Sequence, residues 1–107
     1  MQNYRIEYLP TAQEDLKSIA DWYMVNFSGK SAAKVINSIL STVERLAMFP
    51  NSGSLTPDKF LNKLGYRMVI IRHHVAIYRF INNVIYIYHV ADTRTEYTKL
   101  FYKPINN

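Results

Sequence analysis

The spacing of the apolar residues changes once along this chain of 107 residues, and that change limits the folds it can adopt. Before Pro50, apolar residues recur mostly at intervals typical of amphipathic helices. After residue 65, β-branched and aromatic residues follow the two-residue period of strands. We therefore expect a single α+β domain spanning residues 1–107, with helices packed on a sheet.

The predicted elements follow in the order β-α-α-β-β-β. A first strand covers residues 4–9, and helices follow at 11–27 and 31–48, where Thr11 and Glu14 have the spacing of a capping box. Residues 50–65 predict a loop with one helical turn at 57–63, and strands are expected at 66–73, 75–81 and 84–91. Asn82 and Asn83 are typical of a two-residue hairpin turn. The tail at 95–102 is compatible with either a helix or an extended chain.

This order predicts an N-terminal strand and an antiparallel helical hairpin packed on a small antiparallel sheet. The helix residues expected against the sheet are Leu16, Ile19, Ile39 and Leu40. The aromatic residues assigned to packing are Tyr23, Phe27, Phe49 and Tyr78.

Positive charge is concentrated in the second half of the chain. Residues 1–58 carry five Lys or Arg against six Asp or Glu, a net charge of −1, whereas residues 59–107 carry eight against two, a net charge of +6. All three histidines also lie in the second half. This asymmetry favours a basic surface for phosphate or an acidic partner, and the alternative is an ordinary solvated face.

Several classes of protein are disfavoured by the composition. The chain has no cysteine, so neither a disulfide framework nor a thiolate metal site is expected. His73 and His74 are adjacent and would point to opposite faces of a strand, which disfavours a shared metal. We expect no cofactor and no metal. The sequence has neither a secretion signal nor an apolar run long enough for a membrane span, so we expect a cytoplasmic protein.

Cationic and aromatic residues near the strand ends form the best candidate site. The predicted catalytic set is Arg67, His89, Arg94 and Tyr97, because neighbouring strands bring such groups together and cations, an imidazole and a phenol suit phosphodiester chemistry. The predicted target-binding set is Arg67, Arg72, His74, Arg79, Arg94 and Lys99. The alternative is structural: Tyr97 packs over the sheet end, and the arginines pair with Asp92 and Glu96.

Four segments carry a resemblance to a known family. They are YRIEYLPTAQEDLKSIADWY, RLAMFPNSG, GYRMVIIRHHVAIYRF and VIYIYHVADTRTEYTKL, which together cover nearly the whole chain. In this order they resemble the RelE/ParE superfamily, the toxins of type II toxin–antitoxin modules. The resemblance implies a growth-inhibiting toxin that is silenced in a hetero-oligomer with a cognate antitoxin. Its target would be DNA gyrase in the ParE branch, or the ribosome and its mRNA in the RelE branch, whose members are endoribonucleases.

The two branches differ at particular positions. The RNases usually carry an arginine three positions before the tyrosine of the middle strand, and aligned on Tyr78 that position is Val75. The segment HHVAIYRF is more similar to the ParE branch. Arg94 and Tyr97 match an Arg and a Tyr of the RNases, whereas Asp92 stands where they commonly have His. The resemblance therefore favours ParE-like inhibition of gyrase, with an mRNA endoribonuclease as the alternative.

Overall fold

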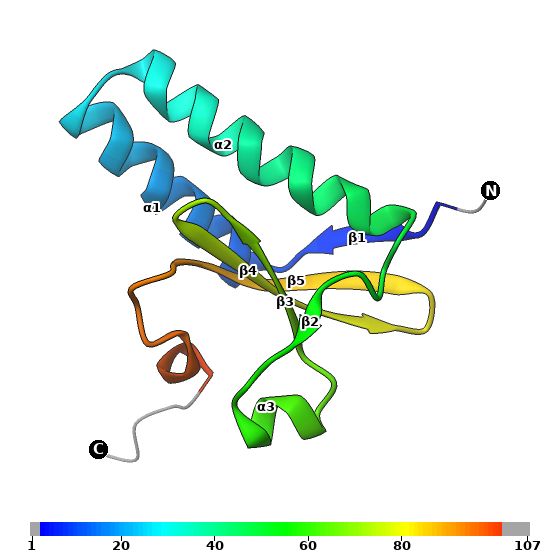
Figure 1. The fold of residues 1–107 in the computed structure, drawn as a ribbon. Coiled ribbons are helices and arrows are strands. Elements are labelled where there is room, and N and C mark those ends of the chain that lie inside the picture. Colours follow the sequence, from blue (N-terminus) through cyan, green and yellow to red (C-terminus); the bar gives the residue numbers. More distant parts are fainter. Residues whose placement is uncertain (1–2, 102–107) are drawn as a thin grey trace.

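The computed structural model describes residues 3–101. It consists of a central sheet with helical segments on each of its two faces (Figure 1). The strands are β1 (Arg5–Tyr8), β2 (Ser54–Leu55), β3 (Arg67–Ile71), β4 (His74–Ile81) and β5 (Val84–Asp92). The helices are α1 (Pro10–Asn26), α2 (Gly29–Glu44) and α3 (Lys59–Lys63), with 3₁₀ turns η1 (Arg45–Ala47) and η2 (Tyr97–Leu100). The predicted β-α-α-β-β-β order is confirmed. Tyr102 and Lys103, which belong to the predicted tail and to the charge count, lie outside the described residues.

The five strands form one sheet in the order β1-β5-β4-β3-β2. The predicted antiparallel meander is confirmed for β3, β4 and β5, and the turn residues Asn82 and Asn83 both have positive φ, 51° and 65°. β1 pairs in parallel with β5, which makes the sheet mixed. β2 lies inside the segment predicted as a loop, because two residues are too few to show a period.

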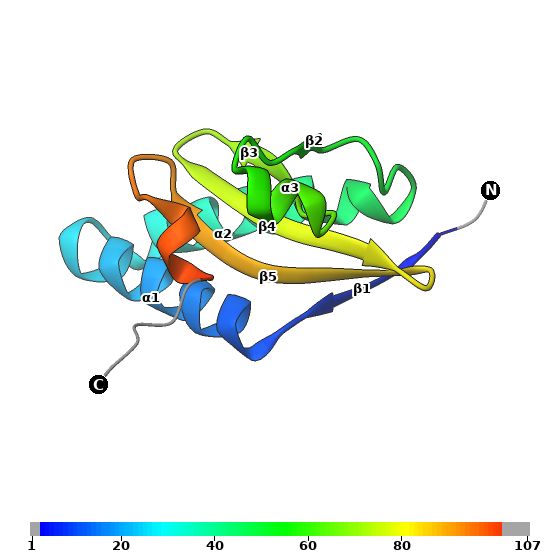
Figure 2. The same cartoon turned by 90° about the horizontal axis from the view of Figure 1, so that it is seen from below.

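The helical hairpin covers one face of the sheet, and α3 and η2 lie on the other (Figures 1 and 2). One buried cluster, on the hairpin side, joins Ala12, Ile39, Val43 and Leu46 to the inward residues of β4 and β5. A second cluster, on the α3 side, joins Leu61 and Tyr66 to Val75 and Ile77. Burial on both faces explains why the apolar residues of β4 are nearly continuous.

The helix boundaries differ from prediction at two places. α1 begins at Pro10 after Leu9, which forms no side-chain cap, so the capping box predicted at Thr11 and Glu14 is wrong. Proline already fixes the φ that the first helical turn needs. The Thr11 hydroxyl instead donates to the Tyr88 carbonyl oxygen of β5. At the other end of the hairpin, the Ser28 hydroxyl caps α2 by accepting from the Ser31 N–H.

The predicted buried face of the helices is largely confirmed. Ile39 is fully buried, and Leu16 and Ile19 pack against the cluster on the hairpin side. Leu40 is half-buried and lies outside that cluster, because the neighbouring position of a helix is rotated by about 100°. In the part of the chain that the structure describes, no helix is long and apolar enough to cross a membrane.

Candidate functional site: a cleft beside the β3–β4 hairpin

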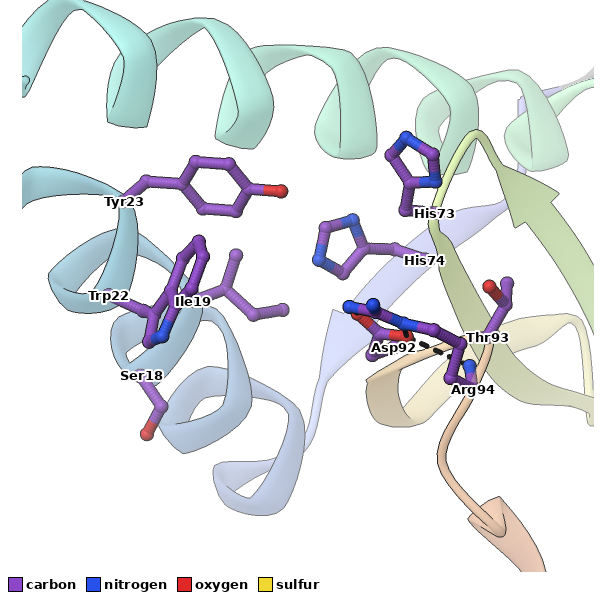
Figure 3. Close-up of a pocket in the computed structure, with 9 residues that line it drawn as sticks. All are labelled: Ser18, Ile19, Trp22, Tyr23, His73, His74, Asp92, Thr93 and Arg94. Carbon is purple, nitrogen blue, oxygen red and sulfur yellow. Dashed lines mark hydrogen bonds and ion pairs between the residues drawn. The ribbon is translucent and has the colours of Figure 1, made fainter. Parts of the chain in front are cut away.

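A cleft of about 640 Å³ opens between α1 and the end of the sheet where β4 begins and β5 ends. Three parts of the chain line it, and Figure 3 shows their side chains facing one another across the opening. The lining residues are Ser18, Ile19, Trp22 and Tyr23 from α1, His73 and His74 from the hairpin, and Asp92, Thr93 and Arg94 from the end of β5. A volume of this size falls within the range of ligand-binding clefts.

The α1 wall of the cleft is aromatic. The Trp22 ring lies 5.1 Å from the Tyr23 ring and 5.8 Å from the Phe27 ring, measured between centroids. Trp22 remains 55% exposed and Phe27 65% exposed. The assignment of Phe27 to packing is therefore wrong, as is that of Phe49, which is 57% exposed, whereas Tyr78 is fully buried. Exposed aromatic side chains grouped in this way are typical of binding surfaces.

The facing wall carries an ion pair. Arg94 donates from Nε to Asp92 Oδ1 and from Nη2 to Asp92 Oδ2, both at 2.9 Å, and its backbone N–H also reaches Oδ1 at 2.8 Å. These bonds hold the pKa of Asp92 well below its usual range. The Arg94 side chain is 88% exposed, and its remaining N–H donors face solvent.

His74 forms the floor between these walls. It is 6% exposed and lies opposite Asp92 in the β4–β5 pairing. Burial lowers its pKa, and the nearby Asp92 carboxylate opposes that shift. His73, the preceding residue of the hairpin, is exposed to solvent and also lines the cleft.

Arg67 is the first residue of β3 and lies at the opposite end of that strand from the cleft. In the pairing of β3 with β4 it is opposite Tyr78, which is four residues, or about 13 Å, along β4 from His74. Its Nη1 donates to the carbonyl oxygens of Asn51 (3.2 Å) and Gly53 (2.6 Å). The Tyr78 hydroxyl accepts from the Gly53 N–H (3.0 Å) and donates to the Pro50 carbonyl oxygen (2.8 Å). We call these contacts of Arg67 and Tyr78 with residues 50–53 the latch.

The other predicted site residues are dispersed around the sheet. His89 Nδ1 lies 2.8 Å from Asp15 Oδ2, and its ring packs edge-on against Phe101. Arg79 lies over the Tyr66 ring at 5.0 Å. Tyr97 packs against the cluster on the α3 side, as the structural alternative stated, and burial raises its pKa.

Two further cations of the predicted binding set lie on the surface. Lys99 pairs with Glu96 at 3.1 Å on η2. Arg72 is exposed in the β3–β4 hairpin, where its φ is 55°. The structure therefore brings together only His74 and Arg94 at the cleft, with Arg72 close by in the same hairpin.

Sequence reasoning missed the α1 wall. The sequence predictions give Trp22 no role. Trp22 belongs to a run of apolar residues with Met24, Val25 and Phe27, and successive residues of a helix point in different directions, so these side chains cannot all face the sheet. A run of that kind at the tip of a helical hairpin leaves apolar side chains exposed, and this was the available signal. Within residues 3–101, no group of three or more His, Asp or Glu could hold a metal ion.

Two solved structures have a fold similar to that of this chain. A chromosomal ParDE system from P. aeruginosa has a similar structure, with a TM-score of 0.72 and 23% identity over 83% of this chain and 95% of that one. The toxin–antitoxin complex RelBE2 from Mycobacterium tuberculosis is similar with a TM-score of 0.63 and 15% identity, over 84% of this chain and 98% of that one. No curated protein matches the sequence.

The fold of this chain, with its order of elements, is the fold shared by these two structures. The family model described as the ParE toxin of the type II toxin–antitoxin system parDE matches residues 6–97. This chain belongs to the ParE toxin family.

Proposed function

We propose that this toxin inhibits DNA gyrase by binding it, without catalysing a reaction itself. The observation that carries the proposal is the separation of the four groups predicted to be catalytic. Arg67 is held in the latch, His89 is paired with Asp15 beneath Phe101, Tyr97 packs against the α3 side, and only Arg94 faces the cleft. General acid–base chemistry on a phosphodiester needs such groups within hydrogen-bond reach of one substrate.

Two further features support binding over RNA cleavage. Val75, at the position where the RNases usually carry an arginine, is 3% exposed and packs in the cluster on the α3 side, so a cation there would be buried. The raised pKa of Tyr97 also opposes a role for its phenolate as a base at neutral pH.

The cleft supplies what a protein-binding surface needs. Trp, Tyr and Arg contribute the largest binding energies in protein interfaces, and here Trp22, Tyr23 and Arg94 line one concave surface. We assign the contact with gyrase to this cleft and to the adjoining aromatic tip of α1. We further propose that a cognate antitoxin neutralises the toxin in a cytoplasmic hetero-oligomer.

The alternative is ribosome-dependent mRNA cleavage. It is favoured by the exposed guanidinium of Arg94 beside His73 and His74, because a cation next to imidazoles suits a phosphate group. A direct comparison separates the two functions. Purified toxin is added to a DNA supercoiling assay with gyrase and, in parallel, to ribosomes programmed with a defined mRNA.

We expect inhibited supercoiling with accumulated double-strand breaks, and an intact mRNA. Cleavage of the ribosome-bound mRNA with unaffected gyrase would overturn the proposal and establish the alternative. Trp22→Ala serves as the matched site variant in both assays, because its exposed side chain contributes little to folding.

A further inference from the structure

The cleft beside the β3–β4 hairpin has two walls of different chemistry. The only tryptophan of the chain, Trp22, belongs to the α1 wall, and the Arg94 guanidinium belongs to the facing wall. Figure 3 shows the indole and the guanidinium on opposite sides of the opening. The volume of about 640 Å³ leaves room for a small ligand that touches both walls at once.

The indole of Trp22 is available for stacking. Its ring planes meet those of Tyr23 and Phe27 at 77° and 57°, so neither neighbour is stacked in parallel on it. These two contacts restrict the rotation of the indole, and Trp22 still remains 55% exposed. An exposed aromatic ring that is held in place is a platform for a planar partner, and nucleobases stack well on such platforms.

The Arg94 guanidinium is held with one edge free. Asp92 accepts from Nε and from Nη2, both at 2.9 Å, and the three remaining N–H donors of the guanidinium lie on Nη1 and Nη2. Donors on these two nitrogens bind a phosphate group in a bidentate manner. A second cation, Arg72, is exposed in the hairpin and lines a small neighbouring pocket with Tyr23 and His74. Asp92 therefore positions Arg94 for an anion that enters the cleft.

The space between the two walls is continuous. The pKa of Arg94 is raised, chiefly by its hydrogen bonds to Asp92 and in smaller part by the Tyr23 oxygen across the cleft. The Tyr23 and His74 rings lie 6.2 Å apart, measured between centroids. Burial lowers the pKa of His74 below its usual 6.5, so its imidazole is neutral at pH 7 and offers one donor and one acceptor. The floor of the cleft therefore suits an uncharged polar group.

We propose that the cleft binds a free purine nucleoside phosphate. The purine stacks on Trp22, the ribose lies over the floor formed by Ile19 and His74, and the phosphate binds the free edge of the Arg94 guanidinium. Arg72 adds positive potential from the hairpin. A purine is favoured over a pyrimidine because its two rings offer a larger stacking surface.

Other anions match only part of this arrangement. Inorganic phosphate or an acidic side chain would meet Arg94 and leave Trp22 without a partner, and phenyl phosphate is too small to fill the cleft. A nucleic-acid strand needs cations along its whole path. The α1 residues that line the cleft include no cation, so positive charge stands at one end only. The inference goes beyond the proposed function, because it assigns a small ligand to a surface that also contacts a protein.

The fluorescence of Trp22 tests the proposal directly, because no other tryptophan contributes to the signal. The full chain is titrated with AMP, with excitation at the red edge of the indole band, where adenine does not absorb. We expect saturable quenching by AMP. Adenosine, inorganic phosphate and phenyl phosphate should each bind at least tenfold more weakly, and CMP at least threefold more weakly.

Matched variants, followed by calorimetry, assign the two contacts. Arg94→Gln should weaken AMP binding at least tenfold, whereas Arg5→Gln, which removes the same charge from an exposed position of β1, should bind like the parent. Trp22→Ala should also weaken binding at least tenfold, whereas Trp22→Phe keeps a ring for stacking and should remain within about threefold of the parent. Thermal unfolding of each variant checks that it is folded.

Several results would overturn the inference. They are the lack of saturable quenching, equal binding of AMP and inorganic phosphate, equal binding of AMP and adenosine, and parent-like binding by Arg94→Gln. A short single-stranded oligodeoxyadenylate is the last comparison, and we expect it to bind no more tightly than AMP. Tenfold tighter binding would overturn the assignment to a free nucleotide, because the occupant would then be a strand.

This test is independent of the gyrase assay, since it uses the toxin alone. A toxin that blocks supercoiling but does not bind AMP keeps its proposed function and loses this inference. A toxin that leaves gyrase active but binds AMP through Trp22 and Arg94 shows the reverse.

Discussion

The latch and the cleft use the same kinds of side chain for opposite purposes. At the latch, Arg67 and Tyr78 are turned toward the backbone of residues 50–53 and have their hydrogen bonds satisfied there. At the cleft, Arg94 and Tyr23 line an open concavity, and within residues 3–101 the Arg94 guanidinium is bonded only to the half-buried Asp92. An arginine or a tyrosine therefore has a structural role where its side chain can reach backbone carbonyl oxygens. Where no carbonyl oxygen lies within reach, the side chain remains available to a binding partner.

The largest effect is expected at the latch, from Gly53→Ala. A Cβ at this position would lie 2.5 Å from the Tyr78 hydroxyl and 2.8 Å from the Met68 carbonyl oxygen. Since the second atom belongs to the backbone of β3, we expect a loss of about 3 kcal/mol in the free energy of unfolding, measured in urea. Gly29→Ala is the control, because a Cβ there has no atom within 4 Å. Equal unfolding free energies of the two variants would mean that the chain around Gly53 can shift to accommodate a Cβ without losing the latch contacts.

A smaller loss is expected when single latch bonds are removed. Arg67→Ala and Tyr78→Phe each leave buried or half-buried backbone groups without a partner, at a cost of about 2 kcal/mol in unfolding free energy. Inhibition of gyrase per folded molecule should not change. If an Arg67→Ala protein melts like the parent but no longer inhibits growth, then Arg67 has a functional role and not a structural one.

The cleft end should behave in the reverse way. Trp22→Ala should weaken gyrase inhibition about tenfold, equivalent to about 1.4 kcal/mol of binding, with unfolding free energy within about 0.5 kcal/mol of the parent. Asn37→Ala, at an exposed position of α2 that does not line the cleft, is the control for a general change on the helical hairpin. If both variants inhibit supercoiling like the parent, the target contacts another surface.

The smallest effect concerns pH and distinguishes the two histidines of the hairpin. The pKa of His74 is lowered in the folded protein, so below pH 6.5 the unfolded chain binds its proton more readily than the folded one. Stability attributable to His74 is therefore complete above pH 6.5 and falls as the pH drops below that value. Asp92 and Arg94 face the same imidazole, and protonation of Asp92 would add a further loss only below about pH 4.

Thermal unfolding at pH 7 and pH 5.5 checks this sign. His74→Gln should lose less stability over that interval than His73→Gln, in which the buried imidazole is still present. An equal decrease in the two variants would place the titrating group elsewhere in the protein.

The fold was largely predictable because its determinants are local. Apolar spacing located α1 and α2, and the Asn82-Asn83 pair placed the hairpin between β4 and β5. The start of α1 was mispredicted because Thr11 and Glu14 have the spacing of a capping box. In the structure, the Thr11 hydroxyl instead donates to the Tyr88 carbonyl oxygen of β5. Nothing within a single helix reveals a bond to a strand nearly eighty residues away.

The candidate site was harder to predict because it depends on what each side chain meets after folding. Arg67 and Arg94 are equivalent in a sequence, since both are cations at the end of a strand, yet only one has backbone carbonyl oxygens in front of it. The aromatic wall was missed for a related reason. Trp22 counts as core by its chemistry, and only the lack of a covering element at the tip of α1 makes it surface.

The parallel pairing of β1 with β5 governs when a newly made chain can fold. β1, which is the first strand of this domain to be translated, pairs with residues 84–87 of β5, which is the last strand of the domain to be translated. Until then β1 has no neighbour in the sheet, and the wall of the cleft that carries Asp92 and Arg94 does not exist. A nascent chain interrupted before residue 84 is therefore expected to remain unfolded and harmless, because the domain cannot form before β5 has been made.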